Sequence, residues 1–181
     1  NSYCYINNFL QNQSHLKPKY IIINYCVNDT ELLPDSSKNW FIKNSQLVAT
    51  LYITIKKMLS QKDAGLIDYY NNLHEESNVG YQLMIESMSQ LSDYSKKNDV
   101  KVIFVFIPEV HFLDNYPFLN INQKMEKVAM EFGFDFFDLY DTLKDIKFED
   151  IKIMDGDAHP NAFIHSLIAK DLNTYIENHL K

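Results

Sequence analysis

The clearest group of residues able to do chemistry lies near the carboxyl end of the chain, in the run Asp157-Ala158-His159-Pro160-Asn161. A carboxylate two residues before a histidine, ahead of a helix, can pair a general base with the group that orients it. The carboxylate would hold the imidazole tautomer and stabilise the imidazolium that forms. The same run is also compatible with a turn in which an Asp or His caps the following helix.

A second candidate, Asn28, follows the apolar run of residues 20–26. If that run is a strand, the Asn28 amide lies at the carboxyl edge of a sheet, where its N–H groups can donate to an oxyanion. Asn28 and Asp29 could instead simply turn or cap the chain. Because one reacting carbonyl must reach both an oxyanion donor and a base, we expect Asn28 and His159 to converge at one sheet edge.

The rest of the chain supplies the elements that must position these residues. Short apolar runs predict buried strands at residues 20–26, 100–107 and 134–139. Apolar residues at helical spacing predict helices over residues 39–60, 79–97 and 120–132. Gly133 is expected to cap the third of these helices, and a last helix is expected to begin at Pro160.

Alternating strands and helices indicate an open α/β fold with a parallel sheet. In such sheets ligands bind at the carboxyl ends of the strands. This rule points to Asn28 and Asp29 after the first strand, and to residues 108–111 after the second.

Taken together, the two blocks resemble those of the SGNH/GDSL hydrolase family of serine esterases. Residues 20–29 resemble the family's third block, a hydrophobic strand that ends in Asn-Asp. Residues 157–162, followed by an apolar helix, resemble its last block, commonly written Asp-x-(x-)His-Pro-Asn-Ala. Their order and placement also match, and the resemblance extends from near the start of the chain to its end.

The resemblance implies a three-layer α/β/α sandwich with a flavodoxin-like parallel sheet, and an ester hydrolase that needs no cofactor. In this family a serine attacks the ester carbonyl and forms an acyl-enzyme. Backbone N–H groups of the serine and of a glycine, with an asparagine side chain, hold the oxyanion. Carried over to this sequence, Asn28 is the oxyanion donor, His159 the general base and Asp157 its orienter. The substrate would be a small ester or an O-acyl group on a glycan.

The sequence departs from the family pattern in its first block, because the 181 residues contain no Gly-Asp-Ser motif. Ser2 lies too close to Asn28 to supply it. We therefore expect a single domain over residues 1–181 that is incomplete at its N-terminus, with the serine and the first strand upstream. Gly156 stands where many members carry the triad acid, which leaves Asp157 as first choice and Asp155 as second.

Two other functions are compatible with the same residues. An O-acyltransferase would use the same triad but pass the acyl group to a sugar. A catalytically inactive SGNH-like binding module would keep the fold without the serine. Acceptor dependence of turnover would distinguish the first alternative, and the upstream sequence would distinguish the second.

Other side chains are weaker candidates. Glu109 and His111 could line a substrate pocket, although a plain loop is favoured there, and His165 is expected to pack or lie on the surface of the last helix. Cys26 could be a nucleophile, but a thiol within a strand is more often inert. A metal site built from Asp157, His159 and His165 lacks the paired histidine spacing of such sites, so neither metal nor cofactor is expected.

Composition limits the partners. The formal net charge of -7 argues against nucleic acid and against a basic contact with anionic lipid. No apolar run approaches the roughly 20 residues that span a bilayer. The two cysteines could pair or remain free, and the sequence leaves the compartment and the oligomeric state open.

Overall fold

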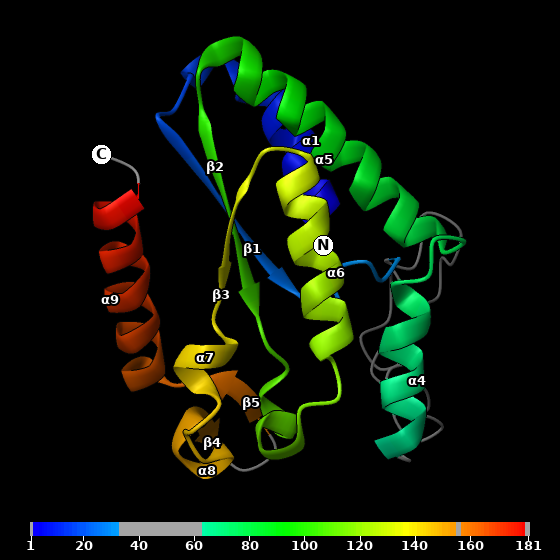
Figure 1. The fold of residues 1–181 in the computed structure, drawn as a ribbon, viewed down its shortest axis with the longest axis vertical. Coiled ribbons are helices and arrows are strands. Elements are labelled where there is room, and N and C mark those ends of the chain that lie inside the picture. Colours follow the sequence, from blue (N-terminus) through cyan, green and yellow to red (C-terminus); the bar gives the residue numbers. More distant parts are fainter. Residues whose placement is uncertain (1, 33–62, 155–156, 180–181) are drawn as a thin grey trace, which may run out of the picture.

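A computed structural model describes residues 2–32, 63–154 and 157–179 (Figure 1). At its centre is a three-stranded parallel sheet in the order β1-β2-β3. The strands are β1 (Tyr20–Cys26), β2 (Lys101–Ile107) and β3 (Asp135–Asp138). The three predicted strands and the mixed α/β class are confirmed, with small shifts at the strand ends.

The middle strand, β2, is buried on both faces. Side chains alternate across a strand, so Val102, Phe104 and Phe106 enter one apolar cluster while Ile103 and Val105 enter another. This near-continuous apolar run is typical of a parallel strand covered on both sides. The sequence of β2 therefore requires helices against both faces of the sheet.

Three helices contribute to the first cluster: α1 (Ser2–Asn12), α5 (Val79–Asn98) and α6 (Leu119–Glu131) (Figure 1). The predicted helices at 79–97 and 120–132 are thus confirmed, whereas the one predicted at 39–60 lies outside the described residues. Asn78 caps α5 by accepting from the backbone N–H of Gly80 at 2.9 Å. Gly133 follows α6 with a φ of 78°, as expected for a glycine that ends a helix.

The other face is packed by α9 (Ala162–His179), through buried Ile164 and a half-buried apolar stripe that continues along the helix. The expected start at Pro160 is wrong. Asn161 Oδ1 accepts from the backbone N–H of Ile164 at 3.1 Å and caps the helix. Pro160 instead belongs to a strand, where its backbone lies opposite Lys152.

Short elements gather beyond the carboxyl ends of β2 and β3 (Figure 1). They are the 3₁₀ helix η2 (Val110–Asn115), the helices α7 (Tyr140–Leu143) and α8 (Phe148–Ile151), and the antiparallel strands β4 (Lys152–Met154) and β5 (Asp157–Pro160). The loop favoured after the second strand is therefore wrong, because residues 110–115 are helical. A further helix, α4 (Asp63–Leu73), precedes α5, and the short η1 (Ser14–Leu16) precedes β1. None of the described helices is both long enough and apolar enough to cross a bilayer.

One glycine joins the start of α5 to the turn that carries Asn28. A Cβ atom on Gly80 would lie 1.8 Å from the backbone oxygen of Thr30, which is too close for any side chain. The contact therefore requires a glycine, and it couples α5 to the segment that follows β1.

We expect the substitution Gly80→Ala to lower the free energy of unfolding by at least about 2 kcal/mol, because backbone must move to admit the methyl group. Gly133→Ala is the matched control: it meets no atom within 4 Å and carries only the strain of its positive φ, about 1 kcal/mol. Urea denaturation measures both. Equal effects of the two substitutions would contradict the close approach of α5 to Thr30.

Candidate active site at the carboxyl edge of the sheet

The turn after β1 leaves the Asn28 side chain exposed. The turn is closed by the backbone, with Asp29 N–H donating to the Cys26 carbonyl at 2.9 Å and Glu31 N–H donating to the Asn28 carbonyl at 3.0 Å. The Asp29 carboxylate accepts from the Cys26 N–H at 2.9 Å. Asp29 thus caps the turn with its side chain, and the Asn28 side-chain amide makes no hydrogen bond to the described residues.

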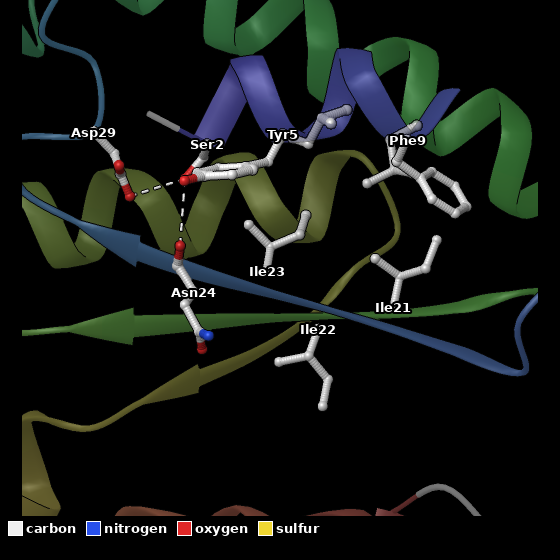
Figure 2. Close-up of a pocket in the computed structure, with 10 residues that line it drawn as sticks. Ser2, Tyr5, Phe9, Ile21, Ile22, Ile23, Asn24 and Asp29 are labelled. Atoms are coloured by element: carbon white, nitrogen blue, oxygen red, sulfur yellow. Dashed lines mark hydrogen bonds between the residues drawn. The ribbon is translucent and has the colours of Figure 1, made fainter. Parts of the chain in front are cut away.

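Through its hydroxyl, Ser2 contacts the carboxyl end of β1 and the turn that follows it. Its side chain is buried, and Oγ lies 2.9 Å from Asp29 Oδ2 and 3.3 Å from the Asn24 carbonyl oxygen (Figure 2). Ser2 is the first residue of α1, so these contacts fasten the start of the helix to the carboxyl end of β1.

His159 lies exposed on β5. Asn161 anchors this hairpin, because its Nδ2 donates to the Asp150 carbonyl at 2.8 Å and its backbone N–H donates to the Ile151 carbonyl at 2.8 Å. Asp157 pairs through its backbone with Met154, and Asp155 lies outside the described residues. The hydrogen bond from His159 to one of these two carboxylates therefore stays a prediction.

Asn28 and His159 belong to the same end of the domain. Asn28 follows the carboxyl end of β1, and β5 lies beyond the carboxyl ends of the neighbouring strands (Figure 1). The two sequence blocks therefore lie at the same end of the domain, although β5 belongs to a separate two-stranded sheet. Direct convergence of the two side chains stays a prediction.

A carboxylate–imidazole pair, Glu109 with His111, occupies this edge just after β2. His111 Nδ1 lies 2.5 Å from Glu109 Oε1, and the same oxygen accepts from the His111 backbone N–H at 3.3 Å. The His111 ring also packs on Phe148 of α8, with centroids 4.9 Å apart. The sequence singled out both residues, but not their contact, which depends on the turn into η2.

Cys26 is poorly suited to be a nucleophile. Burial raises the pKa of its thiol to about 12, and the negative charges of Asp29 and Glu109 add to the shift. A thiol with so high a pKa is almost entirely protonated at neutral pH, and only the thiolate is strongly nucleophilic. Both Cys26 and the exposed Cys4 are free.

An apolar hollow near the carboxyl end of β1 does not contain the candidate pair. It has a volume of about 350 Å³ and lies between α1 and β1, lined by residues such as Tyr5, Phe9 and Ile22 (Figure 2). Neither Asn28 nor His159 lines it. The hollow lies on the side of β1 that faces away from β2, where Ser2 contacts the Asn24 carbonyl.

The sequence also missed a buried pair, Tyr25 with His74. Tyr25 Oη lies 2.6 Å from His74 Nε2, and His74 Nδ1 lies 2.8 Å from the Tyr70 carbonyl. A carbonyl only accepts, so Nδ1 carries the proton and Tyr25 donates to Nε2. Burial lowers the pKa of His74, and the positive charge of Lys124 lowers it further, although the bond to Tyr70 acts in the opposite direction. No pattern in the sequence connects residues this far apart.

No group of three or more His, Cys, Asp or Glu side chains within the described ranges is arranged to hold a metal ion. His165 is exposed on α9. The sequence predicts that it either packs against a neighbour or lies on the surface of this helix. Comparison of the chain with protein-family models, with curated proteins and with solved structures finds no match.

The two cysteines should differ in reactivity. We expect iodoacetamide at pH 8 to alkylate one thiol per native chain, Cys4, because Cys26 is both half-buried and held protonated. Mass spectrometry after digestion identifies the site, and both thiols should react in urea. In the variant Cys4→Ser the native chain should remain unlabelled, and rapid labelling of Cys26 there would contradict the raised pKa.

The free energy of unfolding should decrease as the pH is lowered, because His74 is buried. Its pKa in the folded state lies below the unfolded value of about 6.5, so as pH falls below that value only the unfolded chain takes up the proton. The free energy of unfolding should then decrease by up to about 1.4 kcal/mol per pH unit from this group. Denaturation at pH 7.5 and 5.5 measures the change, and His74→Gln should reduce it. An unchanged pH dependence in that variant would contradict the assignment.

Proposed function

We propose that this chain is the larger part of a serine ester hydrolase of the SGNH type, with an α/β/α sandwich fold. The observation that carries the proposal is the position of the Asp157–His159 block. It lies on an anchored hairpin at the carboxyl end of a parallel sheet, at the same end as an exposed Asn28. An oxyanion donor and a general base at one sheet edge are two of the groups that acyl transfer needs.

In the proposed reaction a serine hydroxyl attacks the ester carbonyl while His159 Nε2 takes its proton. The Asn28 amide donates to the oxygen that gains negative charge. His159 then gives the proton to the leaving alcohol. Water next attacks the acyl-enzyme while His159 takes its proton, and that proton returns to the serine as the carboxylic acid leaves. Asp157 would hold His159 Nδ1 and stabilise the imidazolium. The serine itself would come from a segment outside these residues.

Among the described residues no strand pairs with the side of β1 that faces away from β2, and this supports the last point. Lys101 N–H donates to the Lys19 carbonyl at 3.2 Å. The backbone N–H and C=O groups of every second residue, counted from Lys19, therefore face β2. The backbone N–H and C=O groups of Ile22 and Asn24 therefore face away from β2, and Ile22 is 43% exposed. A further strand here would cover the hollow beneath α1 and end beside Asn28. A serine at the carboxyl end of such a strand would reach the site.

The test compares the 181-residue chain with a longer one that carries an upstream Gly-Asp-Ser segment, using a chromogenic acetyl ester and a serine-reactive fluorophosphonate. We expect hydrolysis and labelling only in the longer chain. In it, His159→Ala should lower kcat by at least about 10³-fold and Asn28→Ala by about 10² to 10³-fold. Asp157→Asn should lower kcat with little change in KM, because Asp157 acts through the base.

His165→Ala is the matched control, since this exposed histidine on α9 lies close to His159 in sequence and takes no part in the proposed reaction. Its kcat should match that of the parent enzyme. Labelling of Ser2 in the 181-residue chain, with full turnover, would show that the nucleophile is misplaced. A longer chain that is not labelled would favour a binding module, and turnover that requires an added sugar would favour an acyltransferase.

A further inference from the structure

Hydrogen bonds and a ring contact hold the side chains of Glu109 and His111 in fixed positions. Glu109 Oε1 receives both the Nδ1 and the backbone N–H of His111, and its side chain is only 18% exposed. Phe148 packs against one face of the same ring. The imidazole is thus fixed at one nitrogen and on one face.

This geometry determines the hydrogen-bonding character of the ring. A carboxylate can only accept, so in the neutral imidazole Nδ1 carries the hydrogen and Nε2 keeps its lone pair. No described residue hydrogen-bonds to Nε2, and the His111 side chain is 49% exposed. The edge of the sheet therefore presents a pre-oriented acceptor, which is complementary to a hydroxyl group.

The position of the acceptor relates it to the candidate base. Helix α8, which carries Phe148, contacts both η2, which holds His111, and β5, which holds His159. In the proposed reaction His159 returns its proton to the leaving alcohol, so the alcohol half of the ester must lie within reach of β5. A second hydroxyl on that alcohol would then lie toward the α8 surface and His111.

We propose that His111 Nε2 binds a hydroxyl group of the alcohol half of the ester, so that a sugar ester is preferred to a small ester whose alcohol carries no further hydroxyl. This rests on the proposed function, which names the bound group as part of an ester and places its alcohol half within reach of β5. A site built to accept from a hydroxyl discriminates against analogues that lack one, because its oriented acceptor is then left without a partner. Glu109 acts as a positioning residue, since it sets the tautomer and direction of the ring.

The test measures binding rather than turnover, so it does not depend on a nucleophile. The 181-residue chain labelled with ¹⁵N-histidine is titrated at pH 8 with methyl β-glucopyranoside, and in parallel with tetrahydropyran, which has the ring but no hydroxyl groups. The glucoside should shift the His111 Nε2 resonance saturably, and tetrahydropyran should not. His111→Phe, which keeps a ring against Phe148, should weaken glucoside binding about ten-fold.

Two comparisons separate the proposed roles. Glu109→Gln keeps an acceptor for Nδ1 and should bind nearly as the parent does, whereas Glu109→Ala should bind several-fold more weakly. His15→Phe alters an exposed histidine of η1, before β1, and should change nothing. Absence of a shift, an equal shift with tetrahydropyran, or unchanged binding in His111→Phe would each overturn the inference.

The outcome is independent of the esterase test. Esterase activity without glucoside binding at His111 would overturn this inference and leave the proposed function standing. Glucoside binding at His111 in a protein whose longer form has no esterase activity would support a hydroxyl-binding site and remove the proposed function.

Discussion

Burial of β2 on both faces is the constraint on which the rest of the structure depends. Residues 102–106 are all apolar and lie almost entirely out of contact with solvent. Such a strand is stable only between two others and beneath helices on both sides, because its peptide groups and its side chains must all be removed from water. The parallel pairing then brings the carboxyl ends of three strands to one edge.

The edge formed by these carboxyl ends is polar, because the buried apolar runs end there. Where β1 and β2 end, the apolar run gives way to Asn28 and Asp29 on one strand and to Glu109 and His111 on the next. Capping uses part of this polar set, since Asp29 holds the turn and Ser2, and Glu109 holds η2. The groups left over, the Asn28 amide and the outer nitrogen of His111, are the ones with capacity to meet a ligand.

The His159 block reaches this edge by a separate route. Strands β4 and β5 form their own small antiparallel sheet, outside the main one. Asn161 donates to two carbonyl oxygens of α8 and so anchors the hairpin there. Its side chain also caps α9, the helix that covers one face of the sheet. One asparagine thereby relates the position of His159 to the apolar contacts of Ile164 in the core.

The sequence by itself determined the strands, the helices α5 and α6, the last helix apart from its start, and the sheet edge at which polar residues collect. These features depend on local periodicity and on the β-branched and aromatic runs at residues 20–26 and 100–107, which need no knowledge of distant contacts. Tertiary structure alone decided the start of α9, the Glu109–His111 contact and the buried Tyr25–His74 pair. Pro160 favours a helix start locally, but pairing with Lys152 outweighs that preference. Contacts of this kind depend on which segments the folded sheet brings together, and no spacing along the chain encodes them.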